Sequence, residues 1–246
     1  TAYTDLIGMD PGVVDMSWNI IDEQSIYLNS RMDRLWIDYN YKKFQVTLGR
    51  QRINWGQALV WNPNDIFNAY SFFDFDYVER PGSDAIRLQY FTSSSSAAEL
   101  AVKVDSEKDL TMAGLYRFNS FGYDFQFLAG FVNSEDIVIG AGWSGSIGSL
   151  SFRGEGSWFQ QYEEFPRSEG TILVTAGLDK VFKDNSMAQI QLMYSNNPLG
   201  FIDFYSFVGG ELSSKDLAFS EFSAFGQFTW AVTPMLNLSV SSMWFP

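Results

Sequence analysis

Apolar and polar residues alternate along many segments of the chain. In residues 98–104, for example, Ala98, Leu100, Val102 and Val104 alternate with Glu99, Ala101 and Lys103. Residues 121–131, 150–158, 172–178 and 188–194 repeat this pattern. A period of two over about ten residues is typical of a β-strand with one apolar and one polar face. Helical spacing does not persist anywhere, so the sequence predicts an all-β fold.

The alternation predicts thirteen strands, at residues 14–22, 26–39, 43–52, 84–92, 97–104, 110–118, 121–132, 136–145, 148–159, 170–182, 186–194, 217–231 and 235–244. Every second connection is tight, whereas the long connections, 53–83, 160–169 and 195–216, all fall in the other set. Outer-membrane barrels sort their connections in this way, with short turns in the periplasm and longer loops outside. Between Met32 and Leu35 the alternation slips, which indicates a β-bulge or a strand that leaves the membrane.

A soluble β-sandwich also alternates, but its core is mostly aliphatic and its other face meets water. Here one phase carries long aromatic rows, and the other is rich in Gly, Ser, Thr and Gln with few charges. Aromatic residues also recur near strand ends, as the interfacial girdles of a barrel require. They are Tyr116, Phe118, Phe121, Trp143, Trp158, Trp230 and Trp244. We therefore expect an antiparallel transmembrane β-barrel.

The two phases predict which side chains face lipid and which line the lumen. The lipid-facing set is Phe125, Phe127, Ile139, Phe152, Val174 and Ile190. The pore-lining set is Arg87, Glu99, Lys103, Arg117, Asp124, Arg153 and Glu155. We expect ion pairs within the second set, between Arg153 and Glu155 and between Arg117 and Asp124. Abundant glycine and serine on the same phase, such as Gly140 and Gly142, favour an open interior.

Thirteen strands cannot close a bacterial barrel, which has an even number of strands. We expect residues 1–246 to be a single barrel domain that is incomplete, with at least one C-terminal strand missing and about 14–16 strands in the full protein. The N-terminus carries no secretory signal, so the chain reads as a mature or trimmed product.

The composition excludes several classes of function. The 246 residues include no Cys and no His, which removes thiol nucleophiles, Ser-His-Asp triads and His-ligated metals. The net charge of −13 disfavours nucleic acid as a partner. The pair Asp74 and Asp76 lacks EF-hand spacing, so we expect no metal site and no cofactor. The sequence does not predict an enzyme.

One motif extends over residues 49–90. It contains the stretches GRQRINWG at 49–56, WNPNDIFN at 61–68 and ERPGSDAIRLQY at 79–90. This motif resembles the signature of a largely uncharacterised group of Gram-negative outer-membrane porin-like barrels, distantly similar to alginate-export-type porins. The resemblance implies a monomeric barrel with a structured extracellular loop after an early strand, and it implies no particular substrate.

The connection at 53–83 is the longest and is predicted to be an extracellular or lumen-folded loop. Its aromatic residues make a solvated tail costly, so it packs on the rim, packs on itself as a lid or enters the lumen. Asn62 and Pro63 suggest the start of a short helix within it. If the loop enters the lumen, Asp65, Asp74, Asp76 and Glu79, opposed by Arg80, form a negative constriction that prefers cations.

Three functions remain. The first is an outer-membrane channel for passive or weakly selective passage of small solutes. The second is a barrel that acts as a scaffold or anchor in a larger outer-membrane assembly, and the third is a hydrolase or adhesin built on a barrel. The expected partners are outer-membrane lipid and lipopolysaccharide, small solutes and, for the scaffold, other envelope proteins.

Overall fold

The computed structural model describes residues 10, 12–23, 26–68, 82–199 and 213–246. Every regular element in these ranges is a β-strand, which confirms the all-β prediction. The strands are β1 (Ser17–Glu23), β2 (Ile26–Arg31), β3 (Leu35–Tyr41), β4 (Phe44–Gln51), β5 (Ser83–Phe91), β6 (Ala97–Val104), β7 (Leu110–Ser120), β8 (Tyr123–Val132), β9 (Asp136–Ile147), β10 (Leu150–Gln161), β11 (Thr171–Val181), β12 (Met187–Ser195), β13 (Phe222–Thr233) and β14 (Leu236–Trp244). Among the described residues, no helix is long and apolar enough to cross a membrane.

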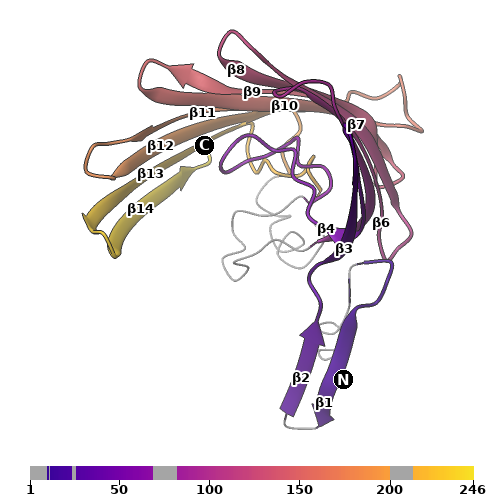
Figure 1. The fold of residues 1–246 in the computed structure, drawn as a ribbon. Coiled ribbons are helices and arrows are strands. Elements are labelled where there is room, and N and C mark those ends of the chain that lie inside the picture. Colours follow the sequence, from indigo (N-terminus) through magenta and orange to yellow (C-terminus); the bar gives the residue numbers. More distant parts are fainter. Residues whose placement is uncertain (1–9, 11, 24–25, 69–81, 200–212) are drawn as a thin grey trace.

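Strands β3 to β14 form one 12-stranded sheet in which each strand pairs antiparallel with its neighbour in the sequence. The sheet curves strongly, so that it has a convex outer face and a concave inner face (Figure 1). Strands β1 and β2 form a separate hairpin that extends away from the sheet. The fold is therefore a meander of hairpins wound into an arch.

The expected strand at 26–39 is wrong, because the chain forms two strands there. Strand β2 ends at Arg31 and β3 begins at Leu35, and the two belong to different sheets. The break falls where the alternation slips. The described chain therefore has fourteen strands, one more than the predicted thirteen, and twelve of them form the main sheet.

The connections sort by rim as predicted. The turns at 42–43, 92–96, 121–122, 148–149, 182–186 and 234–235 lie at one rim of the sheet. The connections between β4 and β5, β10 and β11, and β12 and β13 lie at the opposite rim and are longer. The tight turns use left-handed backbone where two residues reverse the chain, for example Phe121 with φ 53° and Gly122 with φ 79°.

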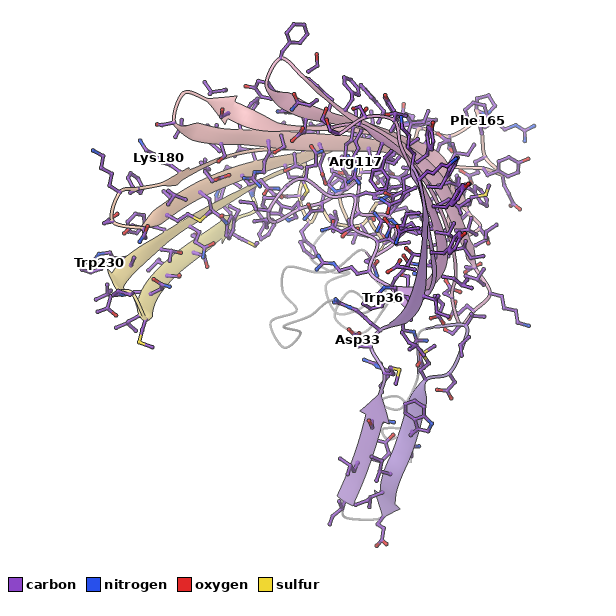
Figure 2. All side chains as sticks on the ribbon, in the orientation of Figure 1. Asp33, Trp36, Arg117, Phe165, Lys180 and Trp230 are labelled. Atoms are coloured by element: carbon purple, nitrogen blue, oxygen red, sulfur yellow. The ribbon has the colours of Figure 1, made fainter. Side chains whose placement is uncertain are left out.

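The two faces of the sheet have the composition that the alternation predicts. The convex face exposes Phe127, Ile139, Val174 and Ile190, with Phe125 and Phe152 partly covered. Glu99 and Glu155 lie on the other face and are buried, at 4% and 0% exposure. At the short-turn rim Phe121 is 96% exposed and Trp230 lies near the end of β13 (Figure 2). The apolar phase therefore points outward.

Arg50 fixes the segment before β1 to the long-loop rim. Its guanidinium pairs with Asp10 at 2.7 Å and Asp84 at 2.8 Å and donates to the carbonyl of Val14 at 2.7 Å. All three charged side chains are at most 8% exposed. Gly49, with φ 118°, precedes Arg50 because a methyl group there would lie 2.4 Å from the carbonyl of Leu35. This cluster explains the Gly49-Arg50 part of the motif.

Both edges of the main sheet are free of strand partners in the described chain. Strand β3 pairs only with β4, β14 pairs only with β13, and β1 pairs only with β2. Residues 235–244 and 14–22 therefore do not pair with each other in the described chain. Figure 1 shows the two edges of the arch standing apart.

Candidate functional site on the concave face

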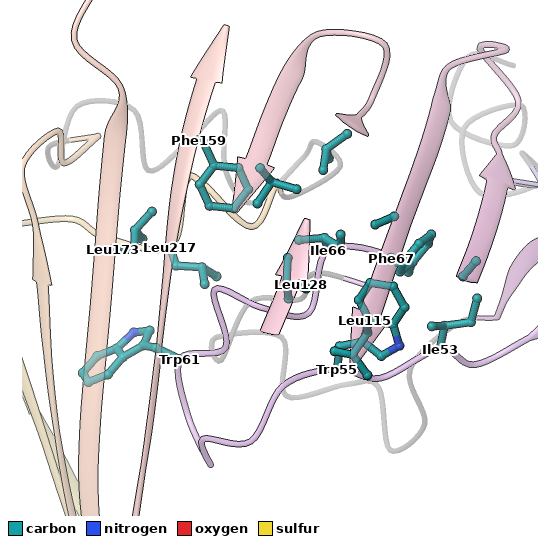
Figure 3. Packing of buried hydrophobic residues seen from close by; sticks show 14 of the residues in the cluster. Ile53, Trp55, Trp61, Ile66, Phe67, Leu115, Leu128, Phe159, Leu173 and Leu217 are labelled. Atoms are coloured by element: carbon teal, nitrogen blue, oxygen red, sulfur yellow. The ribbon is translucent and has the colours of Figure 1, made fainter. Parts of the chain in front are cut away.

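Residues 52–68, which we call the inner segment, lie against the concave face of the sheet (Figures 1 and 3). The segment is irregular, and its apolar side chains are the cause of its position. Ile53, Trp55, Trp61 and Phe67 are at most 3% exposed, and they belong to one apolar cluster with the wall residues Leu115, Leu128, Phe159 and Leu173. Trp55 and Phe67 pack edge to face, with ring centroids 4.8 Å apart. Burying a large apolar side chain stabilises by about 1.5–3 kcal/mol, so this cluster holds the inner segment inside the arch.

Glu155 of β10 is the central polar contact of the inner segment. Its two carboxylate oxygens accept the backbone N–H groups of Gln57 at 2.5 Å and Asn64 at 3.3 Å. The side chain is completely buried, and a buried carboxylate needs such donors. One wall residue therefore ties two points of the inner segment together.

Two glutamines of the wall also replace the hydrogen bonds that an irregular backbone lacks. Gln191 accepts the N–H of Val60 at 3.0 Å and donates to the carbonyl of Trp61 at 3.1 Å. Gln126 donates to the carbonyl of Trp55. A buried backbone group without a partner is costly, so these side chains make the irregular path of the segment stable.

Asn64 packs against the wall at a position where glycine residues leave space for its side chain. Its side-chain amide donates to the carbonyl of Ala141 at 3.0 Å and accepts from Ser157 Oγ at 2.6 Å. A methyl group at Gly140 would lie 2.5 Å from Asn64 Oδ1. The small residues at 140 and 142 therefore accommodate the inner segment, and the expectation that they leave the interior open there is wrong.

The helix expected at Asn62 and Pro63 does not form. The N–H of Asp65 bonds to the carbonyl of Asn62 at 3.0 Å, which closes a turn with Pro63 and Asn64 at its centre. Proline is favoured at the second position of such a turn as well as at the first position of a helix. The contacts of Asn64 with the wall decide for the turn.

The ion pairs of the concave face differ in part from those expected. Arg87 pairs with Glu99 through two bonds of 2.7 and 2.8 Å, and Gln89 and the indole of Trp55 donate to the same carboxylate. This group joins β5, β6 and the inner segment. Lys103 lies on the same phase of β6 and is half-buried.

Arg153 pairs with Asp179 of β11 at 2.8 Å, so the expected pair with Glu155 is wrong. Position 153 faces Gly177 in the ladder, and Asp179 is diagonal to it. Because Glu155 binds the backbone of the inner segment, Arg153 pairs with the carboxylate on the neighbouring strand.

The expected pair of Arg117 and Asp124 is wrong in the described structure. Asp124 faces Asn119 in the ladder and accepts the amide of that residue at 2.8 Å. Arg117 faces Gln126. Arg117 and Asp124 instead lie on the wall of a cavity of about 230 Å³ beside Asn54 and Gln57 of the inner segment. Figure 2 shows Arg117 on the inner side of the arch.

A second segment, residues 213–221, covers the inner segment, and we call it the capping segment. Ser214 donates to the carbonyl of Asp65 at 2.9 Å, and Lys215 pairs with Asp136 at 2.6 Å. Burial opposes the charge of Lys215, but the bond to Asp136 and the nearby carboxylates outweigh burial and raise the pKa of the amine. Leu217 and Ala218 belong to the same apolar cluster as the inner segment. The two long connections are therefore packed together within the arch.

The residues of the expected constriction have different outcomes. Asp65 belongs to the inner segment and is 1% exposed, beneath the capping segment. Asp74, Asp76, Glu79 and Arg80 lie outside the described residues, as does the Asp74–Asp76 pair considered for calcium. No group of metal-ligating side chains occurs among the described residues.

Several residues of the concave face were not singled out from the sequence. The polar phase of the strands contains Gln126, Asp179 and Gln191, so their facing was visible in the alternation. Their partners were not, because the path of the inner segment was needed to identify them. Lys215 gave no signal at all, since it belongs to a long irregular connection.

No protein-family model matches the chain, and no curated protein matches it. Among solved structures, the chain is similar to the crystal structure of OccD1 (OprD) Y282R/D307H, with a TM-score of 0.41 and 8% sequence identity. The match covers 88% of this chain and 78% of that one. The resemblance to alginate-export-type porins is not tested by this match and stays a prediction. We therefore argue the function from the residues of the chain itself.

Proposed function

We propose that the chain forms the wall and the inner constriction of a porin-like channel in the bacterial outer membrane, through which small solutes pass with weak selectivity. One observation supports this most. A single meandering sheet has an apolar exposed convex face and a polar concave face, and a long connection is fastened to the polar side by wall residues. In a transmembrane barrel the same arrangement separates lipid from lumen.

The convex face supports the membrane part of the proposal. Exposed aromatic and branched apolar side chains follow one another across neighbouring strands, for example Phe127, Ile139 and Val174. In water an apolar surface of this extent is unfavourable, and it marks an interaction site. Lipid and lipopolysaccharide are the partners that suit the whole face, and the long-loop rim would then lie outside the cell.

The inner segment supports the channel part of the proposal. Side chains from β8, β10 and β12 bind its backbone, so it is held across a wide part of the concave face. A fixed segment inside a barrel narrows the path without blocking every solute. The proposal includes further strands beside β3 and β14, which would complete the barrel around the segment.

We also propose a modest preference for cations. The chain carries 29 acidic and 16 basic residues, and the connection at 53–83 contributes Asp74, Asp76 and Glu79 against Arg80. Asp65 is buried, so its effect on a permeating ion would be weaker than that of an exposed carboxylate. Reversal potentials under a salt gradient test this. Anion preference, or an unchanged potential when Asp74, Asp76 and Glu79 become Asn and Gln, would contradict it.

The experiment for the channel itself is single-channel recording of the full chain in planar bilayers, together with a variant in which residues 54–66 are replaced by a short Gly-Ser linker. We expect discrete conductance steps from the parent chain and larger steps from the variant. Retained heat-modifiable migration in gels would show that the variant still folds. No conductance from the folded parent chain would overturn the proposal.

The alternative is a barrel whose lumen is plugged and which serves as a scaffold or anchor. The packing of the inner and capping segments into one apolar cluster favours this alternative. The two functions differ in the same recordings, because a plugged barrel inserts into the bilayer without conducting, and its linker variant conducts.

A further inference from the structure

The cavity beside the inner segment is lined by groups whose hydrogen-bonding capacity is not used up. It lies between residues 54–57 and strands β7 and β8, near the turn that contains Ser95, and its volume is about 230 Å³. Pockets for drug-sized ligands start at about 300 Å³, so the volume suits one small solute. Its position is on the concave face, between the inner segment and the short-turn rim.

The donors and acceptors of the cavity can be assigned one by one. Asn54 Oδ1 accepts the N–H of Gly56 at 3.0 Å, which leaves the amide nitrogen of Asn54 as a donor. One carboxylate oxygen of Asp124 is taken by Asn119, which leaves the other as an acceptor. The side-chain amide of Gln126 donates to the carbonyl of Trp55, so Gln126 forms a part of the cavity wall with a fixed orientation.

Two further groups make the cavity chemically specific. Gln57 Oε1 is buried and has no hydrogen-bond partner in the described structure. A buried acceptor without a partner is costly, so a rotation of the Gln57 amide that turns Oε1 toward a donor in the cavity would be favourable. The guanidinium of Arg117, on the same wall as Asp124, forms no ion pair within the described residues and supplies several donors.

The cavity therefore combines one cationic donor, one anionic acceptor and two amides, with no net charge. A hydroxyl group both donates and accepts, so vicinal hydroxyls can satisfy neighbouring donors and acceptors at once. A simple anion would leave Asp124 facing like charge, and a simple cation would do the same to Arg117. We propose that this cavity is a binding subsite for a neutral polyhydroxylated solute of monosaccharide size.

This inference deepens the proposed channel, since the solute must reach the concave face. Its test is a binding measurement that needs no conduction. Saturation-transfer NMR on the full chain in detergent micelles would compare glucose with glycine, lactate and ethylamine. We expect glucose to bind with millimolar affinity and more strongly than the three charged compounds.

Three variants locate the binding. Gln57→Leu, Arg117→Gln and Asp124→Asn should each weaken glucose binding at least fivefold, whereas Arg167→Gln, an exposed residue of the β10–β11 connection, should leave it unchanged. Equal affinities in all four variants would place the binding elsewhere and overturn the inference. Stronger binding of glycine than of glucose would also overturn it, because the charged pair would then serve a zwitterion.

Conductance separates this inference from the proposed channel. If the parent chain binds glucose, the three cavity variants bind it more weakly and the chain never conducts, then the proposed channel is wrong and the subsite stands. If the chain conducts and does not bind glucose, then the proposed channel stands and the proposed subsite is wrong.

Discussion

At the scale of single residues, the concave face depends on a few polar side chains that serve as partners for irregular backbone. Glu155 is the clearest case, because one carboxylate binds the N–H groups of Gln57 and Asn64. Such a residue acts on the inner segment as a second attachment beside the apolar cluster. Its removal should loosen the segment without unfolding the sheet.

Glu155→Ala should lower the free energy of unfolding by about 1–3 kcal/mol, since two buried N–H groups lose their acceptor. It should also expose the inner segment to chymotrypsin, with faster cleavage after Trp61, which is 3% exposed in the intact structure. Cleavage kinetics in micelles measure this. Glu163→Ala, at an exposed carboxylate of the β10–β11 connection, is the matched control. Equal cleavage rates in both variants would contradict the role given to Glu155.

Gly140→Ala should displace the inner segment by crowding it. The added methyl group would lie 2.5 Å from Asn64 Oδ1 and 2.9 Å from Ser157 Oγ, so we expect a loss of about 1–3 kcal/mol. Gly226→Ala places its methyl group in open space and should be neutral or slightly stabilising. Urea titrations of the two variants in vesicles, followed by tryptophan fluorescence, compare them. If Gly140→Ala keeps the stability of the parent chain, or if Gly226→Ala loses stability as well, the close approach of position 140 to Asn64 does not determine the stability difference.

The facing of side chains was predictable from the sequence because a period of two is a local property. The contacts were less predictable, because they depend on register and on distant segments. Arg153 could reach either Glu155 or Asp179 from the same face, and only the position of the inner segment decides which carboxylate is left for it.

At the scale of elements, each strand has to present one face to lipid and the other to the interior. Strand β12 shows this well, with Ile190 and Leu192 exposed on one face and Gln191 and Met193 buried on the other. The sorting follows from the same meander, because successive connections alternate between the two rims and the long ones all fall at the same rim. These features were predictable, whereas the division at residues 32–34 appeared in the sequence only as a slip in the alternation.

Ile190→Arg should cost about 2–4 kcal/mol if β12 crosses a bilayer, because Ile190 lies near the middle of the strand on its convex face. Ile147→Arg, at the end of β9 by the short-turn rim, should cost about 0–1 kcal/mol. Unfolding of both variants from lipid vesicles measures the difference. Equal and small costs would show that the convex face meets water or protein and not hydrocarbon.

At the scale of the whole molecule, the arch has two edges whose outward backbone groups have no strand partner in the described chain. All seven residues of β3 are exposed, and so is nearly every residue of β14. In hydrocarbon each unpaired group costs several kcal/mol, so an open sheet of this kind cannot be the state within a membrane. The alternation predicts where strands and loops lie. It does not predict whether the two edge strands are paired, because their pairing partners lie far away in the sequence or outside the sheet.

We therefore expect both edges to be paired when the protein is embedded in a bilayer. Hydrogen exchange of backbone amides in lipid nanodiscs should then be as slow in β3 and β14 as in the central strands β8 and β9. A double variant with one cysteine at Tyr39 and one at Ser239 would identify the partner, because the chain has no cysteine of its own. A disulfide within one chain would show that the two edges meet, a disulfide-linked dimer would show a second copy, and slow exchange with neither disulfide would point to further strands. Fast exchange confined to β3 and β14 in the bilayer would contradict pairing and, with it, a closed transmembrane barrel.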